Sequence, residues 1–208
     1  MSPASRHATE GVPYRTFTIR SPMKIFMPLG DATEAMDTFY PYYRLQEDGF
    51  DVVIAGPEAR LYHTVLHEIP PDSNVPWDIT QERPGYFIKA TLAFRDARGA
   101  DFAGAFVSGG RAPEYIRYNQ DLLRVMREIH QVGKPIACVC HGIEILTAAG
   151  IIGGRTVTTV PKCQLDAEQG GAKYVDKEVV LDGNIVTSRY WMDNGHLMRE
   201  FLKMLKAR

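Results

Sequence analysis

Four apolar runs along the chain predict the strands of a central sheet. The run PIACVC at 135–140 shows no alternation of polar and apolar residues, which is typical of a strand buried on both faces of a sheet. Three earlier runs predict further strands at 24–29, 51–55 and 104–107. The strand at 104–107 is ended by Ser108-Gly109-Gly110, a sequence typical of a turn.

Segments with helical periodicity separate these strands. A helix is predicted at 119–132, with its apolar residues on one face, and another at 143–149, where Gly150 ends it. A helix also lies between the first two strands, and because Pro41 cannot donate a hydrogen bond, its regular part is expected to begin near Asp37 or Thr38. Strands that alternate with helices predict an α/β fold whose mostly parallel sheet is covered on both faces, with a site at the carboxyl ends of the strands.

The rest of the chain is less regular. Residues 1–20 have no sustained periodicity and are expected to form an N-terminal extension, which leaves 21–208 as a single domain. The long stretch 57–95 is compatible with a functional loop, small β elements or an oligomer contact. Towards the C-terminus the pattern predicts strands at 156–160 and 173–175, a short helix around 164–169, a hairpin turning at Asp182-Gly183 that joins 178–181 to 184–187, and a last helix at 197–205.

Composition and charge exclude several classes of protein. With 208 residues, 45% of them hydrophobic, and a net charge of -1, the chain has the composition of an ordinary globular domain and no basic excess for nucleic acid. No apolar stretch approaches the ~20 residues of a membrane helix. Because the N-terminal sequence also lacks the apolar core of a signal peptide, a cytoplasmic protein without membrane contact is expected. The three cysteines are not spaced as a disulfide framework or as paired zinc ligands, so they are expected to be free thiols.

The joint between strand 135–140 and helix 143–149 is the strongest candidate for chemistry. A strand that turns sharply into a helix holds the side chain at the joint over the carboxyl end of the sheet, where the free N–H groups of the helix point at it. Here that side chain is the thiol of Cys140. Helix N–H groups favour a thiolate, so the turn predicts a thiol pKa below the ~8.5 of free cysteine.

One further pattern resembles a metal-binding motif. His63 and His67 are four residues apart, with Glu68 next to them, and would form a metal-ligand pair if the segment were helical, which its sequence does not favour. Cys163 falls in a loop or short helix and has no assigned role. No metal site is therefore predicted.

Three strings then indicate a family. SGGRAPEYIR at 108–117, GKPIACVCHG at 133–142 and GAKYVDKEVVLDGNIVTSR at 171–189 resemble the ThiJ/PfpI superfamily, in particular its PfpI-type branch. The resemblance extends from about residue 22 to the end. It implies the class I glutamine amidotransferase-like fold, a three-layer αβα sandwich with a flavodoxin-like sheet and a nucleophile elbow. The segment before ERPGY also resembles members described as glyoxalases or deglycases.

The resemblance implies a set of site residues. Cys140 matches the family nucleophile, His141 stands beside it, and the backbone N–H groups of Gly110 and His141 match an oxyanion site. Asp37 matches a glutamate of the first helix that lies against the cysteine, and Asp96 matches a glutamate that a neighbouring subunit places against the histidine. Asp37 and Asp96 are each one methylene shorter than the glutamates they match, which retracts the carboxyl group by on the order of 1.5 Å. A working site is held to within about 0.5 Å, so the two aspartates are a significant departure from the family pattern. Isocyanide hydratases of the superfamily also have aspartate at the Asp37 position, but they lack the histidine.

Several functions remain open on these grounds. The first is a cofactor-free, cysteine-dependent enzyme that acts on small electrophilic carbonyl compounds such as methylglyoxal, in the manner of a glyoxalase or deglycase. The alternatives are a PfpI-type cysteine peptidase or amidase, an isocyanide hydratase, and a stress protein that senses redox state or protects proteins without turnover. A small-molecule substrate, no cofactor and a homo-oligomer are expected in each enzymatic case.

Overall fold

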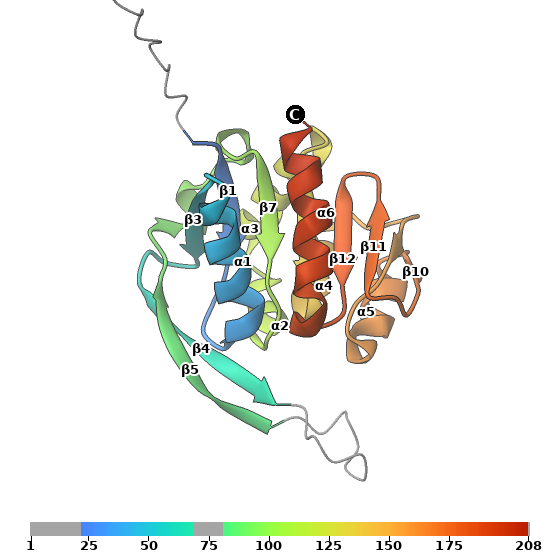
Figure 1. Cartoon of the computed structure of the whole chain (residues 1–208), viewed down its shortest axis with the longest axis horizontal. Coiled ribbons are helices and arrows are strands. Elements are labelled where there is room, and N and C mark those ends of the chain that lie inside the picture. Colours follow the sequence, from blue (N-terminus) through green and yellow to red (C-terminus); the bar gives the residue numbers. More distant parts are fainter. Residues whose placement is uncertain (1–21, 69–80, 208) are drawn as a thin grey trace, which may run out of the picture.

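The computed structural model describes residues 22–68 and 81–207, so the predicted extension at 1–20 and part of the 57–95 stretch lie outside the described residues. A seven-stranded sheet in the order β11-β12-β8-β7-β1-β3-β6 forms the centre of the molecule (Figure 1). Its neighbouring strands are parallel except for the pair β11 and β12. The strands are β1 (Lys24–Pro28), β3 (Asp51–Gly56), β6 (Leu92–Ala93), β7 (Gly104–Val107), β8 (Ile136–Val139), β11 (Val179–Asp182) and β12 (Ile185–Ser188).

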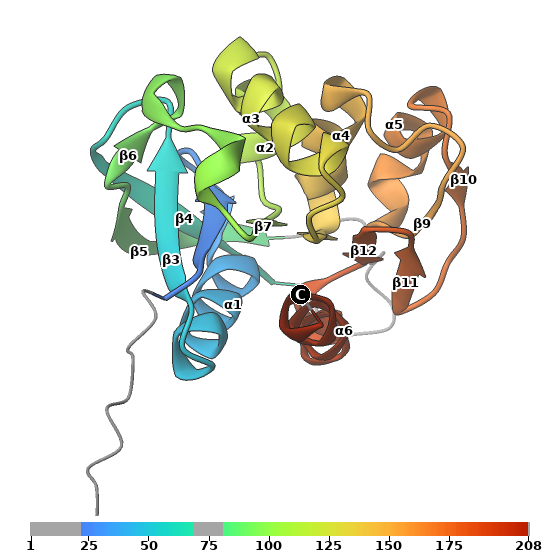
Figure 2. The same ribbon diagram turned by 90° about the horizontal axis from the view of Figure 1, so that it is seen from above.

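Helices cover both faces of this sheet, as the alternation of strands and helices predicts. Seen from above, α1 and α6 lie on one face and α2, α3, α4 and α5 on the other (Figure 2). Two apolar clusters fill the layers: one includes Leu45 of α1 and Leu197 of α6, and the other includes Leu122 of α3 and Ile145 of α4. The helices are α1 (Ala35–Glu47), α2 (Ala112–Ile116), α3 (Gln120–Gln131), α4 (Ile143–Ala149), α5 (Gln164–Gln169) and α6 (Asn194–Lys206). The fold is the predicted mostly parallel α/β sandwich.

Helix α1 begins earlier than predicted, at Ala35, and contains Pro41 in its interior. The expectation of a start near residue 37 was wrong because the cost of the proline is offset at two places. The side chain of Glu34 caps the helix by accepting a hydrogen bond from the Met36 N–H at 3.1 Å. Proline removes the N–H that would bond the carbonyl of Asp37 four residues earlier, and the Ser108 hydroxyl donates to that carbonyl instead, at 3.2 Å. The proline turn therefore ties the Asp37 backbone to the end of β7.

The stretch 57–95 contains a β-hairpin, so the prediction of small β elements is confirmed, while the predicted oligomer contact stays a prediction. β4 (Leu61–Glu68) pairs antiparallel with β5 (Gln81–Lys89), and β2 (Thr33–Glu34) adds to the edge of β4. The hairpin curves away from the body of the molecule beside α1 (Figure 1). Through the pairing of β2 with β4, residues of the hairpin come next to the start of α1.

The C-terminal third departs only slightly from prediction. β9 (Thr156–Val157) is shorter than the predicted strand and pairs with β10 (Lys173–Tyr174) in a separate two-stranded sheet. The Asp182-Gly183 turn joins β11 to β12 as predicted. Within the described residues, no helix combines the length and apolar character that crossing a membrane requires.

Candidate functional site

Cys140 occupies a sharp turn between β8 and α4, as the sequence predicts. Its φ angle of 56° lies in the left-handed region, which non-glycine residues adopt rarely. A short 3-10 helix, Cys140–Gly142, connects the turn to α4. The Thr159 hydroxyl donates to the Cys140 carbonyl at 2.7 Å, which stabilises the strained residue. The backbone thus fixes the direction of the thiol.

The Gly109-Gly110 turn at the end of β7 lies directly against this thiol. A Cβ atom on Gly109 would stand 2.5 Å from the Cys140 Cβ, 3.0 Å from its Sγ and 2.7 Å from Asp37 Oδ2. Gly110 has a φ of 84°, which favours glycine, and its N–H and that of His141 point at the Cys140 sulfur and act to lower its pKa. These are the two N–H groups that the resemblance assigns to an oxyanion site.

Asp37 lies near the Cys140 thiol despite its shorter side chain. Its Oδ2 and the Cys140 Sγ both lie within 3.0 Å of the point where a Gly109 Cβ would stand. The side chain is completely buried, and neither of its oxygens makes a full hydrogen bond within the described part of the chain. Because Gly109 has no Cβ, the Asp37 carboxyl group and the Cys140 sulfur can both lie next to it.

Burial dominates the acid–base properties of this pair. It raises the pKa of Asp37 well above its ordinary value, and the nearby charge of Glu34 raises it further. Burial likewise raises the pKa of the Cys140 thiol, as does the charge of Asp37, against the opposing effect of the two N–H groups. The expectation of a lowered thiol pKa from the turn alone was therefore wrong, because it omitted desolvation and the adjacent acid. Two negative charges close together are disfavoured, so the two groups titrate as a coupled pair.

A line of charged side chains runs from Asp37 towards the surface. Glu34 is 2% exposed, and its Oε2 lies 3.4 Å from His67 Nδ1. His67 Nε2 lies 3.0 Å from Glu82 Oε2, and Arg111 holds Glu82 by two hydrogen bonds. The hydrogen bond with Glu34 raises the pKa of His67. The three-residue spacing of Glu34 and Asp37 indicates only that these two acids are neighbours.

The two candidate histidines for a metal pair have separate partners. His63 and His67 lie on strand β4, not on a helix. His63 Nδ1 pairs with Asp31 Oδ1 at 2.9 Å, whereas His67 bridges the two glutamates. The structure gives no support to a shared ion between them.

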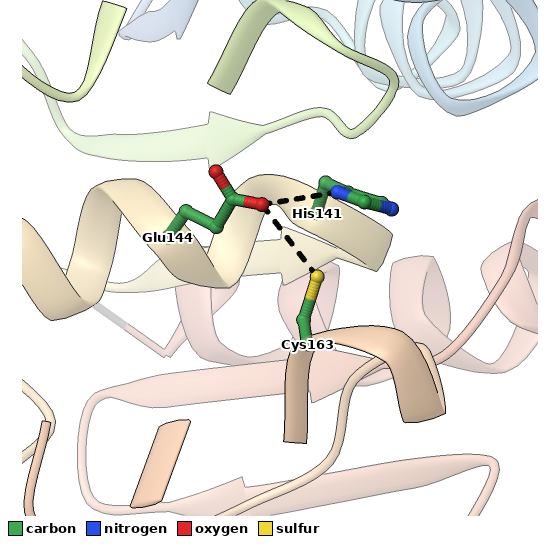
Figure 3. Close-up of side chains that lie close together, drawn as sticks. All are labelled: His141, Glu144 and Cys163. Atoms are coloured by element: carbon green, nitrogen blue, oxygen red, sulfur yellow. Dashed lines mark hydrogen bonds and ion pairs between the residues drawn. The ribbon is translucent and has the colours of Figure 1, made fainter. Parts of the chain in front are cut away.

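His141 has an acidic partner in its own chain. Its Nδ1 lies 3.0 Å from Oε1 of Glu144, one turn along α4, and the thiol of Cys163 donates to the same oxygen at 3.7 Å (Figure 3). Arg117 Nη1 lies 3.2 Å from the other oxygen of Glu144. These contacts were missed from the sequence, although the spacing of His141 and Glu144 by three residues predicts neighbours on a helix. A carboxylate only accepts hydrogen bonds, so Nδ1–H is the donor when Glu144 is the acceptor.

Asp96 is remote from these contacts in the single chain. It ends a 3-10 helix at Phe94–Asp96, its side chain is 63% exposed, and its Oδ2 lies 3.9 Å from Arg95 Nε. The assignment of Asp96 concerns a neighbouring copy of the chain, and it stays a prediction.

A small pocket opens above Cys140. The residues that line it include Asp37, Glu34, Cys140, His141, Tyr190 and Trp191. It offers about 80 Å³ to the centres of water-sized molecules. A single water needs at least about 10–15 Å³ by this measure, so the pocket takes a compact molecule of a few heavy atoms.

Comparison with known proteins shows the family and the fold of the chain. A deglycase of Pyrococcus horikoshii is 36% identical over 184 residues, which cover 88% of this chain and 100% of that protein. Deglycase PfpI of Pyrococcus furiosus is 35% identical with the same coverage of 88% and 100%. DJ-1 of Schizosaccharomyces pombe has the same fold, with a TM-score of 0.69 at 18% identity over 87% of this chain and 90% of that one. The sequence profile of the DJ-1/PfpI family matches residues 23–204, and the chain accordingly belongs to that family.

Proposed function

We propose that this protein is a cysteine-dependent, cofactor-free enzyme that converts small α-oxoaldehydes such as methylglyoxal into hydroxy acids. The observation that carries the proposal is the buried Asp37 carboxyl group beside the Cys140 sulfur at the bottom of a small pocket. The names of the archaeal relatives, which are deglycases, support a related substrate class.

Cys140 and Asp37 perform the first step. As the sulfur attacks the aldehyde carbon, the S–C bond forms, the C=O π pair moves to oxygen, and Asp37 accepts the thiol proton. The raised pKa of Asp37 makes it a stronger base than an ordinary carboxylate. The N–H groups of Gly110 and His141 stabilise the developing oxyanion. The product of this step is a thiohemiacetal.

His141 carries the second proton transfer. Glu144 holds its Nδ1–H, which leaves Nε2 as the base. Removal of the proton from the former aldehyde carbon and its return to the neighbouring carbon convert the thiohemiacetal into a thioester. Water then cleaves the S–C bond, which releases a hydroxy acid and restores the thiol. The net change is the addition of one water to the oxoaldehyde, with no external oxidant or reductant.

The same residues also support a second function, the hydrolysis of amides by a Cys-His-acid triad. The in-chain contact between His141 and Glu144 favours it, since it provides the acid without a neighbouring subunit. The small volume of the pocket weighs against a peptide substrate. If a homo-oligomer instead supplies Asp96, Asp96→Asn would impair turnover more than Glu144→Gln.

The test is a comparison of two matched cysteine variants in the presence of a chelator. Wild type, Cys140→Ala and Cys138→Ala are each incubated with methylglyoxal, an aminopeptidase reporter and an isocyanide. Cys138 is a buried core residue two positions before the nucleophile and controls for loss of a thiol in this strand. We expect lactate from wild type and Cys138→Ala but not from Cys140→Ala. No turnover of any substrate, with a peroxide-dependent gain of mass on Cys140, would instead support a redox-sensing protein.

A further inference from the structure

His141, Glu144 and Cys163 form a three-residue cluster beside the candidate active site (Figure 3). Each offers one ligand atom of a kind that zinc prefers: an imidazole nitrogen, a carboxylate oxygen and a sulfur. We propose that this cluster is a binding site for a divalent transition-metal ion of the Zn²⁺ type, and that the ion inhibits the enzyme by taking His141 as a ligand.

The spacing of the three atoms fits such an ion. His141 Nδ1 lies 3.0 Å and Cys163 Sγ 3.7 Å from Glu144 Oε1, and no pair of the three atoms is more than 4.8 Å apart. Ligands at 2.0–2.3 Å from a tetrahedral Zn²⁺ are separated by about 3.3–3.8 Å. Small side-chain rotations therefore suffice to bring all three atoms to bonding distance. His141 belongs to the 3-10 helix Cys140–Gly142, Glu144 to the first turn of α4, and Cys163 to the 3-10 helix Pro161–Cys163, whose buried residues pack in one apolar cluster with those of α4.

The surroundings hold the ligands in place and balance the charge. Arg117 Nη1 lies 3.2 Å from Glu144 Oε2 and 3.0 Å from Asp166 Oδ1, so Glu144 presents its other oxygen to His141 and Cys163. Outer hydrogen bonds of this kind orient the ligating carboxylate in protein metal sites. A Cys163 thiolate and the Glu144 carboxylate together neutralise a 2+ ion, and Asp166 balances Arg117.

Binding requires one proton to leave. The ion displaces the thiol proton of Cys163 to solvent as the metal–sulfur bond forms, and the Nδ1 proton of His141 moves to Nε2, so no electron transfer is involved. His141 also borders the pocket that contains Cys140, which leaves the fourth position of the ion to a water from that side. Zinc-bound His141 has no free nitrogen base. The predicted inhibition rests on the proposed function, but the binding itself does not.

The experiment uses Co²⁺ as a spectroscopic substitute for Zn²⁺ on tag-free full-length protein. A thiolate ligand gives an intense charge-transfer absorption in the near ultraviolet, which is read for wild type, Cys163→Ser and Cys140→Ser. We expect the band in wild type and in Cys140→Ser, its loss in Cys163→Ser, and bleaching by equimolar Zn²⁺, because Zn²⁺ binds more tightly than Co²⁺. The band gives the same answer whether or not the protein turns over methylglyoxal.

Two outcomes would overturn the proposal: no band in wild type with excess Co²⁺, or a band that persists in Cys163→Ser and is lost in Cys140→Ser. If Cys163→Ser does not fold, as judged by circular dichroism, Glu144→Gln replaces it. Its neutral oxygen should weaken Zn²⁺ binding by at least roughly tenfold, measured by competition with a chromophoric chelator, and an unchanged affinity would also overturn the proposal. In turnover assays Zn²⁺ should inhibit wild type, and Cys163→Ser should require at least roughly tenfold more Zn²⁺ for the same inhibition.

Discussion

The space between Cys140 and Asp37 depends on the absence of a side chain at Gly109, and Gly109→Ala tests it directly. The added Cβ would stand 2.5 Å from the Cys140 Cβ and 2.7 Å from Asp37 Oδ2, whereas ordinary contacts begin at 3.4 Å. Neither neighbour moves freely, because Cys140 belongs to a strained turn and Asp37 is fully buried in α1. The new methyl group must therefore push the sulfur and the carboxyl group apart.

The magnitude follows from the size of this displacement. Misplacement of a catalytic group by on the order of 1 Å costs about 100-fold in rate, so kcat/KM for methylglyoxal should fall by about that factor. Overpacking of a core costs about 1–3 kcal/mol, which corresponds to a decrease in Tm of roughly 2–12 °C for a domain of this size. Lactate formation and thermal unfolding measure the two effects, and the rate of Cys140 alkylation by iodoacetamide gives a reading that needs no substrate.

Gly195→Ala is the matched control. No heavy atom lies within 4 Å of a Cβ built on Gly195, in the first turn of α6. Alanine there should leave kcat/KM unchanged and stabilise the protein by up to about 1 kcal/mol. If Gly109→Ala matched wild type in rate, alkylation and Tm, the close approach of Asp37 to the Cys140 thiol would be refuted.

Three further predictions concern Asp37 and its neighbours. Because the charge of Asp37 raises the pKa of Cys140, Asp37→Asn should lower the pH at which Cys140 is half-alkylated by iodoacetamide; a higher pH would contradict the assigned interaction. Asp37→Glu should lower kcat/KM by about 100-fold, since Asp37 is completely buried and a longer side chain has no room there; a gain in rate would mean that the site is a weakened glutamate type. Ser108→Ala should lower the unfolding free energy by about 1–3 kcal/mol, read by urea denaturation, because it leaves the buried Asp37 carbonyl without its donor; Ser188→Ala, at a buried hydroxyl without a hydrogen-bond partner among the described residues, is the control.

The strands and the turn at Cys140 were predictable because their signals are local. An unbroken apolar run followed by a helix needs only neighbouring residues to be read, and β8 and α4 begin and end within a residue of the prediction. The Asp182-Gly183 hairpin was likewise encoded in one dipeptide.

The errors arose where a distant residue completes a local pattern. The start of α1 was misplaced because Ser108, 71 residues away in sequence, bonds the carbonyl that Pro41 leaves free. The contact of Glu34 with His67 depends on the pairing of β2 with β4, which no sequence period indicates. The thiol pKa was mispredicted for the same reason, since helix N–H groups are visible in the sequence whereas burial is not.

The burial of Asp37 should cost stability, and Asp37→Asn measures how much. The pKa of Asp37 is raised in the folded protein above its ordinary value of 3.8, so the folded state binds the proton more tightly than the unfolded state. The stabilisation that comes from the tighter binding of this proton is fully present below pH 3.8 and is lost as pH rises through the folded pKa of Asp37. A difference of one between the folded and unfolded pKa values of Asp37 corresponds to about 1.4 kcal/mol in the free energy of unfolding. Relative to wild type, Asp37→Asn should therefore become more stable as pH rises from about 4 to the folded pKa, while it loses turnover.

Glu128→Gln provides a control of opposite sign. A hydrogen bond from the Gly99 N–H lowers the pKa of Glu128 below 4.5, so its stabilisation is present at neutral pH and is lost as pH falls through the folded pKa. Relative to wild type, Glu128→Gln should be destabilised at neutral pH, and the difference should shrink in acid. Urea denaturation of both variants and wild type between pH 4 and pH 8 measures the two slopes. An Asp37→Asn variant that is less stable than wild type at pH 8 would contradict the burial argument, whereas a more stable and inactive one would mean that the fold retains this acid for its chemistry, at the expense of stability.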